Sequence, residues 1–452
     1  MSVRYTSDSV SPAPLGQPLT FAFSNRTAPN RFLKGAMSER LASWSPTEPS
    51  ARGIPSPILI NAYRHWGETG SIGVILSGNV LIEYDQLEGP GNMVVTKKEE
   101  AKEGDVRFEA YKEMARQAKK GGSLFVAQLS HPGRQVQDTI QKHPISASDV
   151  QLEGNIMGMT FAKPRPATLE DIQNVISSFA HAASYLEAAG FDGIELHGAH
   201  GYLFAQFLSL TTNKRTDSYG GSLTNRARLI TDVAAAIRKV TKPNFILGIK
   251  INSTEFQANG FQPEEAKELV RILEENTFDF VELSGGTYEQ LVFYHKRETT
   301  KKREAFFIEF AEMIAPGLKK TKVYVTGGLK TVGAMVNALD TVDGVGLGRP
   351  LAQEPAFCAD ILSGKVQGAI AQKLDQDSFE ITNVAAGVQI RQFGKDEQPV
   401  DLSVQENVDA FMADLGKWVE KMGKDTERKE YGYMDLSAKA IPYGAVAPTT
   451  PA

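Results

Sequence analysis

The 452-residue sequence contains a single cysteine, Cys358, and this scarcity excludes several kinds of site. A disulfide within the chain is impossible, and so is a zinc site or an iron–sulfur cluster built on several cysteines. The sequence has no run of about eighteen apolar residues, so it predicts no membrane-spanning helix. Residues 1–20 lack a basic start followed by an apolar core, so we expect no secretory signal. These features together predict a cytoplasmic protein without a membrane partner.

The chain also lacks a strong excess of charge of either sign. It has 49 Lys and Arg against 54 Asp and Glu, which gives a formal net charge of −5 at pH 7. Both signs are mixed along the chain, so nucleic acid is not expected as a partner. The length suits one α/β barrel with extensions, or two or three small domains.

Short apolar runs alternate with longer amphipathic segments after about residue 20. Strands are predicted at 31–35, 73–77, 124–129, 193–197, 245–251, 280–283, 323–326 and 344–347. Helices are predicted between them at 108–119, 169–189, 229–240, 263–276 and 306–314. This alternation predicts a (β/α)₈ TIM barrel, although a doubly wound open sheet would also alternate. The count of eight favours the barrel, and so does the placement of polar motifs after several different strands.

The remaining segments suggest three parts. Residues 1–20, rich in Ser and Pro, are expected to form an N-terminal arm, and residues 21–365 the barrel. From residue 366 to 452 the barrel pattern stops, and the sequence predicts a C-terminal extension with one amphipathic helix at 404–421 and a proline-containing tail. Residues 78–102 and 135–168 are long and polar, so we expect them to lie over the C-terminal mouth of the barrel.

One strand ends in an unusual group of side chains. The apolar run 193–197 ends on His197, and His200 and Tyr202 follow within five residues. Two imidazoles and a phenol can hold a carbonyl oxygen and give a proton to a neighbouring carbon. A histidine that only bonds backbone is an equally good interpretation of the spacing. A zinc site is disfavoured, because no third ligand suggests itself.

Residues 194–226 closely resemble the Old Yellow Enzyme family of flavin-dependent ene-reductases. The family reads His-x-Ala-His/Asn-Gly-Tyr-Leu, then Gln-Phe-Leu, then Asn-x-Arg-x-Asp-x-Tyr-Gly-Gly, and this chain has these elements from His197, Gln206 and Asn213 onward. The resemblance extends with gaps from about residue 30 to 355. It implies that His197 and His200 bind the substrate carbonyl and that Tyr202 protonates the α-carbon.

The resemblance also implies FMN as the cofactor and assigns residues to its ring. Gln128 would bond the pyrimidine edge, and Lys250 would lie near N1 and the C2 carbonyl. An inward lysine in a strand is unusual unless it is paired or functional, which favours a functional Lys250 even without the resemblance. Residues 30–38 resemble the family's Asn-Arg-(x)₄-Pro-Met-Thr/Cys, with Ala36 in place of Pro, Met37 retained, and Ser38 in place of Thr or Cys. Gly78 is expected beside the flavin.

The last two predicted strands end in glycine turns suited to a phosphate. Barrels often bind phosphate after the seventh and eighth strands, where Gly327, Gly328, Gly348 and Arg349 lie here. The resemblance assigns the FMN phosphate to these turns. Tyr288, after the sixth strand, is expected to line the substrate pocket, although a turn with a surface aromatic is an equally good interpretation.

These features predict an FMN-dependent ene-reductase that reduces the activated C=C bond of an α,β-unsaturated carbonyl compound. NADPH or NADH would supply the hydride, the resemblance slightly favouring NADPH. The chain has no Gly-x-Gly-x-x-Gly fingerprint, which fits a nicotinamide that visits and leaves. A homodimer is compatible with the resemblance. Two alternatives stay open, a flavin-free barrel enzyme acting on a phosphorylated metabolite and a flavin-binding protein with a mainly interaction role.

Overall fold

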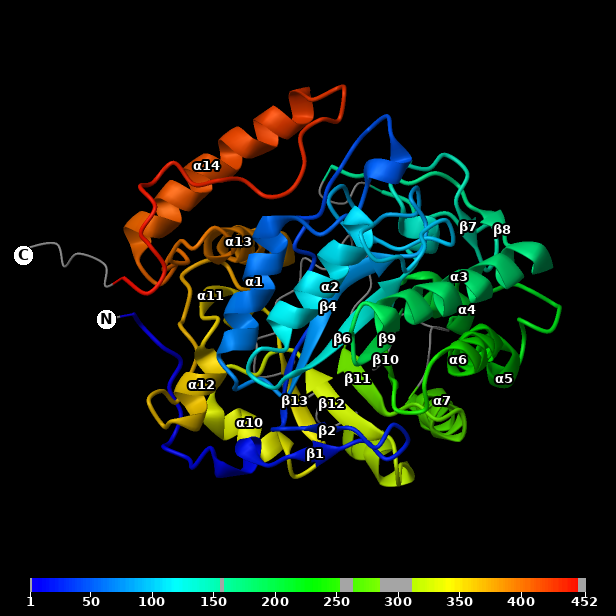
Figure 1. Cartoon of the computed structure of the whole chain (residues 1–452), viewed down its shortest axis with the longest axis horizontal. Coiled ribbons are helices and arrows are strands. Elements are labelled where there is room, and N and C mark those ends of the chain that lie inside the picture. Colours follow the sequence, from blue (N-terminus) through cyan, green and yellow to red (C-terminus); the bar gives the residue numbers. More distant parts are fainter. Residues whose placement is uncertain (1, 155–157, 253–262, 285–310, 446–452) are drawn as a thin grey trace, which may run out of the picture.

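The computed structural model describes residues 2–154, 158–252, 263–284 and 311–445. Its centre is a closed barrel of parallel strands (Figure 1). The eight strands are β3 (Phe32–Lys34), β4 (Val74–Leu81), β6 (Leu124–Ser130), β9 (Gly193–Gly198), β10 (Ile246–Asn252), β11 (Phe280–Ser284), β12 (Lys322–Thr326) and β13 (Gly344–Leu347). Pairing of β3 with both β13 and β4 closes the ring. The predicted (β/α)₈ barrel is therefore confirmed, and an open doubly wound sheet is excluded.

Helices surround the barrel on the outside (Figure 1). The longer ones are α1 (Pro57–Glu68), α2 (Val106–Ala118), α3 (Leu169–Ala188), α6 (Arg228–Val240), α7 (Pro263–Glu275) and α13 (Phe379–Gly394). The shorter ones are α4 (Leu203–Leu208), α5 (Leu223–Arg226), α10 (Val332–Ala338), α11 (Arg349–Gln353) and α12 (Phe357–Leu362). Four predicted helices match α2, α3, α6 and α7, while the predicted helix 306–314 lies mostly outside the described residues. The N-terminus of α3 is fixed by its sequence. Thr168 and Asp171 form a reciprocal capping box that satisfies two otherwise unpaired backbone N–H groups.

The interior of the barrel changes character along its axis. Near the N-terminal ends of the strands the inward side chains are apolar, and they form one buried cluster that includes Leu33, Val74, Leu76, Leu124, Val126, Ile246, Phe280 and Tyr324. Further along the same strands the buried side chains include Gln128, Glu195, Lys250 and Glu282. The apolar layer provides the packing that holds the barrel closed, and the polar layer lies next to the mouth.

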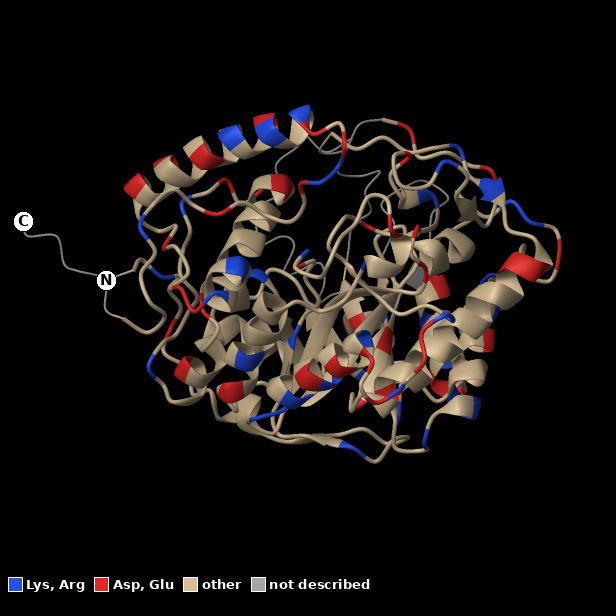
Figure 2. Cartoon of the chain, turned by 45° about the horizontal axis from the view of Figure 1, so that its top comes forward, with Lys and Arg blue, Asp and Glu red and all other residues tan. Residues whose placement is uncertain are grey.

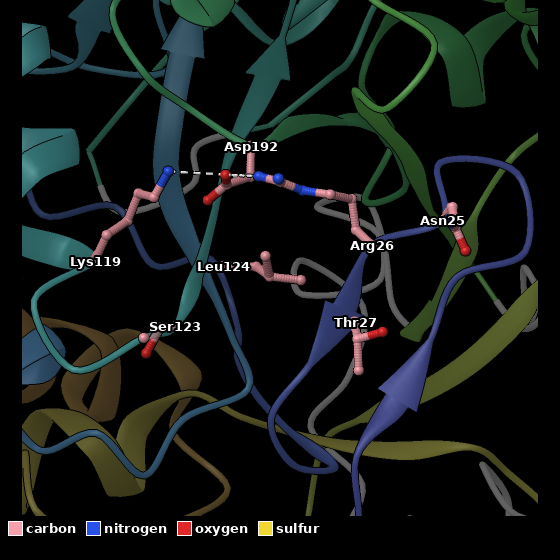
Figure 3. A pocket seen from close by; sticks show the side chains of 8 residues that line it. Asn25, Arg26, Thr27, Lys119, Ser123, Leu124 and Asp192 are labelled. Atoms are coloured by element: carbon pink, nitrogen blue, oxygen red, sulfur yellow. Dashed lines mark hydrogen bonds and ion pairs between the residues drawn. The ribbon is translucent and has the colours of Figure 1, made fainter.

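A hairpin of β1 (Leu19–Thr20) and β2 (Thr27–Ala28) covers the N-terminal end of the barrel. Leu19 and Phe21 of this hairpin belong to the interior apolar cluster. Beside the hairpin turn lies an open hollow of about 450 Å³ (Figure 3). Figure 3 shows Arg26 and Lys119 approaching the Asp192 carboxylate from two sides, and both form ion pairs with it. The hairpin is therefore joined to the barrel by apolar packing and by charge.

The same hydrogen-bond arrangement recurs at the base of three strands. Asp192, Asp279 and Asp343 each stand directly before a strand, and each carboxylate accepts a hydrogen bond from a backbone N–H at the start of the preceding strand. The donors are Phe125, Leu247 and Val323, at 2.9, 3.0 and 3.0 Å respectively. An acceptor at this position satisfies an N–H group that the staggered barrel edge would otherwise leave unpaired.

The C-terminal region packs on the barrel. Helix α13 contacts α1 and α11, and α14 (Gln405–Lys424), which the sequence predicted at 404–421, lies outside α13 (Figure 1). Beyond α14 the chain turns back towards the mouth, where the Trp44 indole N–H donates to the Arg428 carbonyl at 2.8 Å. None of the helices in the described parts of the chain has the length and apolar character to cross a membrane. The division into residues 1–20, 21–365 and 366–452 stays a prediction.

Candidate active site

The predicted site residues lie at one end of the barrel. Because parallel strands all end at the same rim, the positions that follow them meet there. These are Ala36, Met37 and Ser38 after β3, Gly78 in β4, Gln128 in β6, His197 in β9, Lys250 in β10, Gly327 and Gly328 after β12, and Gly348 and Arg349 after β13. Tyr288 lies outside the described residues.

His197, His200 and Tyr202 form a compact cluster at the end of β9. The ring centroids of His197 and His200 are 5.1 Å apart with the rings perpendicular, and those of His197 and Tyr202 are 4.3 Å apart. Tyr202 is 3% exposed and His197 5% exposed, so both are largely shielded from solvent. The structure thus brings two imidazoles and a phenol together at the end of β9.

Both imidazoles are neutral at ordinary pH. Burial, together with the neighbouring His200 and Lys250, holds the pKa of His197 well below its usual range. Burial and Lys250 lower the pKa of His200 to about 3. The Nδ1 atom of His197 accepts from the Ala199 N–H at 3.4 Å, so its proton resides on Nε2. His197 can therefore donate a hydrogen bond to a ligand oxygen without carrying a charge.

His200 is held by residues at the ends of the next two strands. Its backbone N–H donates to the Asn252 side-chain oxygen at 3.0 Å, and its Nε2 lies 3.0 Å from the Ser284 hydroxyl. Its φ of 57° places a non-glycine residue in the left-handed region, which costs energy that these contacts offset. Sequence reasoning assigned no role to Asn252 or Ser284. Their position at the ends of two strands was the feature that could have identified them as site residues.

The second half of the long motif is scaffolding. The Gln206 amide donates to the carbonyls of Pro132 and Gly201, at 2.9 and 2.7 Å. Asn213 donates to the Phe207 carbonyl within the same segment, and Arg215 donates to the Ala167 carbonyl in the segment after β6. These side chains join the loops after β6 and β9, so they fix the positions of His197 and His200 without facing a ligand.

The segment after β3 is organised by two buried carboxylates. The Ser38 hydroxyl accepts from the Asn79 amide at 3.0 Å. Burial opposes ionisation of the Glu88 carboxyl, but Arg40, with help from Ser38, lowers its pKa. The Glu39 carboxylate accepts from the Tyr63 hydroxyl and from the Gly78 N–H. A Cβ at Gly78 would clash with the Glu39 carboxylate, so only glycine leaves room for it. Sequence reasoning did not identify Glu39 or Glu88.

Gln128 and Lys250 both have acidic partners inside the barrel. The Gln128 amide donates to Glu195 at 2.7 Å, and the Lys250 ammonium forms an ion pair with Glu282 at 3.1 Å. Both carboxyl groups are completely buried. The inward lysine that the sequence marked as unusual is therefore paired.

The turns after β12 and β13 both contain glycine. Gly327 and Gly328 have φ angles of 138° and 74°, conformations that favour glycine. A Cβ built on Gly348 would meet nothing closer than the Met37 side chain at 3.9 Å. Arg349 begins α11 beside this turn, and its guanidinium donates to the Thr382 hydroxyl on α13.

The donors around this rim fit FMN. A carboxamide and an ammonium suit a polar ring, and glycine turns with an arginine suit a phosphate. The Asn252 Nδ2 and Thr326 Oγ1 atoms are buried and have no partner among the described residues, as expected at a wall that a ligand completes. The barrel and its rim therefore define a flavin-dependent oxidoreductase with its site at the C-terminal mouth.

Comparison with known proteins agrees with this class. Residues 74–367 match the model of the NADH:flavin oxidoreductase / NADH oxidase family. The chain belongs to this family, the Old Yellow Enzyme family that the motif at 194–226 predicted. FMN is its cofactor, and a reduced nicotinamide is its hydride donor.

Two curated relatives and one solved structure illustrate the extent of the similarity. The chain is 51% identical over 440 residues to the NADH-dependent flavin oxidoreductase nadA of Aspergillus parasiticus, which covers 97% of this chain and 98% of the relative. It is 32% identical to the NADH-dependent flavin oxidoreductase iccE of Talaromyces variabilis, over 73% of this chain and 82% of the relative. Its fold matches morphinone reductase with a TM-score of 0.63 at 21% identity, over 82% of this chain and 94% of that one.

Proposed function

We propose that the protein reduces the C=C bond of an α,β-unsaturated carbonyl compound. The observation that carries this proposal is the cluster of His197, His200 and Tyr202 at the mouth. A reduced flavin at this rim supplies a hydride. The reaction then needs groups that hold the carbonyl oxygen and a group that gives a proton to the α-carbon.

The side chains of the cluster suit these tasks. The neutral imidazole of His197 would donate from Nε2 to the carbonyl oxygen and stabilise the negative charge that develops there. His200 would donate from Nδ1 when the Ser284 hydroxyl donates to its Nε2, since only one ring nitrogen of a neutral imidazole carries the proton. Tyr202, buried beside His197, keeps its proton at neutral pH and would deliver it to the α-carbon.

The names of the relatives favour NADH as the hydride donor. The nadA and iccE proteins are both described as NADH-dependent. We therefore propose NADH rather than NADPH for this protein. Membership of the family removes the alternative of a flavin-free enzyme. The interaction role through residues 366–452 remains a second candidate, and a flavin that NADH cannot reduce would favour it.

Isotope labelling tests the proposed reaction. The protein would be mixed with 2-cyclohexenone and excess NADH in D₂O, and the product analysed by NMR. We expect the saturated ketone, with solvent deuterium at the α-carbon and NADH-derived hydrogen at the β-carbon. An allylic alcohol, or no product from a protein whose flavin NADH does reduce, would contradict enone reduction.

A further inference from the structure

Below the mouth, Glu195 lies where no ligand can touch it. It sits on β9 directly opposite Gln128 of β6, completely buried, and its Oε1 accepts the Gln128 amide hydrogen at 2.7 Å. Its other oxygen, Oε2, is buried and has no hydrogen-bond partner among the described residues. A buried, half-satisfied carboxylate would be costly. The group therefore needs either a countercharge or a proton.

The available countercharge is already engaged. Lys250 pairs with Glu282, its neighbour in the β10–β11 register, at 3.1 Å. The Oε2 atom of Glu282 is also buried without a partner in the described structure, and Glu282 acts on Glu195 across β10, the strand that lies between their two strands. Two ionised carboxylates that lie side by side repel each other, whereas one proton shared between them makes a strong hydrogen bond.

The charges facing this pair come from few elements. Among the described residues, the cations that act on this pair are Lys250 on β10, which acts on Glu195, and Lys34 on β3, which acts on Glu282. Burial first, and Glu282 second, raise the pKa of Glu195 well above its usual range. With one shared proton, the group formed by Glu195, Glu282 and Lys250 is neutral, so its burial costs less than that of a net negative group.

We propose that Glu195 and Glu282 share one proton beneath the mouth, and that Glu195 thereby fixes the orientation of the Gln128 carboxamide. With one amide hydrogen held by Glu195, the Gln128 carbonyl oxygen and its second amide hydrogen are directed towards the rim. Glu195 is thus a positioning residue for the cofactor. This second part rests on the proposed site assignment of Gln128, whereas the shared proton does not.

Infrared difference spectroscopy tests the shared proton and needs no cofactor. The wild-type spectrum should contain a C=O stretch of a protonated carboxylic acid that is missing after Glu195→Gln, because Glu282 then remains a carboxylate paired with Lys250. Burial raises the pKa of Glu83 to about 7, so any acid band from Glu83 should be common to both proteins. Asp414→Asn is the matched control: Asp414 is a buried carboxylate of α14, and the Ser437 N–H and Lys417 lower its pKa despite the opposing effect of burial, so no acid band should disappear. An acid band unchanged by Glu195→Gln would overturn the shared proton.

Two variants test the positioning role by titration of the apoprotein with FMN. Glutamine at 195 can accept from Gln128 and donate to Glu282, so Glu195→Gln should bind FMN within about twofold of the wild type. Glu195→Leu loses both bonds and should bind roughly 5- to 10-fold more weakly, the effect of one typical hydrogen bond. Equal weakening by both variants would overturn the positioning role. If the wild type itself bound no FMN, the assignment of the cofactor site would be wrong. The infrared result would still show whether Glu195 and Glu282 share a proton.

Discussion

At the scale of single residues, Tyr202 separates the two halves of the proposed reaction. Tyr202→Phe should leave reduction of the flavin by NADH nearly unchanged, because no proton transfer to carbon occurs in that half. Reoxidation by a cyclic enone should slow by ~10²–10⁴-fold, the usual contribution of a general acid. Stopped-flow absorbance measures both halves. An equal loss in both would show that Tyr202 is structural.

For Ser38, the hydrogen bonds in the structure suggest a smaller effect on the flavin than the family resemblance implies. The family resemblance places this hydroxyl against the flavin, yet its oxygen accepts from the Asn79 amide, and the hydroxyl helps to lower the pKa of the Glu88 carboxyl. A hydrogen bond to a charged group contributes ~1.5–3 kcal/mol, equivalent to about 30–60 mV for a two-electron couple. We expect Ser38→Ala to shift the midpoint potential of the flavin by less than about 30 mV. A fall of 30–60 mV would show that the hydroxyl turns to the flavin instead.

The histidine pair gives a prediction about pH. The pKa of His200 is lowered to about 3 and that of His197 lies well below its usual range, so neither imidazole gains or loses a proton between pH 5.5 and 8. Binding of an uncharged enone to the oxidised protein should therefore be constant over this interval, as measured by perturbation of the flavin spectrum. A tenfold change centred near the ordinary histidine pKa would contradict neutral imidazoles.

The contrast between found and missed site residues has a physical reason. His197, His200 and Tyr202 stand close together in the sequence, so their spacing revealed them. Glu195 and Glu282, in contrast, meet only because β10 lies between their two strands with a particular register. Such long-range register depends on the closed barrel, which no local pattern specifies.

At the scale of elements, all eight strands were predicted, because each is a short apolar run bounded by turn residues. Helix α13 was not. It is buried on nearly all sides, including polar positions such as Thr382 and Gln389, because it lies between α1, α11 and the C-terminal segment. A helix without an exposed face lacks the one-sided periodicity that identifies amphipathic helices.

The N-terminal hairpin should contribute stability without affecting the site. Asp192→Asn keeps an oxygen for the Phe125 N–H but loses the charge that pairs with Arg26 and Lys119. We expect the free energy of unfolding to fall by ~1–3 kcal/mol, with FMN content unchanged because the hairpin lies at the opposite end of the barrel.

Thermal unfolding together with the flavin absorbance per mole of protein measures both effects. Asp343→Asn is the matched control, since Asp343 makes the same backbone bond but is more exposed, at 28% for its side chain, and should lose less stability. Loss of FMN from Asp192→Asn would contradict our inference that changes at the N-terminal end of the barrel leave the site at the C-terminal mouth unaffected.

At the scale of the whole molecule, the protein combines a barrel common to a large family with a C-terminal region that packs on that barrel. The alignment with nadA covers 97% of this chain, whereas that with iccE covers 73%. Helix α13 packs on α1 of the barrel, and the Arg428 carbonyl accepts from Trp44 of the loop before α1. The interaction role of residues 366–452 and the homodimer stay predictions.

The visible spectrum of the purified protein tests the central claim most directly. Recorded without oxygen, it should show bound oxidised flavin, lose that absorbance on addition of NADH, and regain it on addition of 2-cyclohexenone. A flavin that NADH bleaches but the enone does not restore would contradict the proposed reduction of C=C bonds. A protein without flavin absorbance, even after incubation with FMN, would contradict the cofactor site itself.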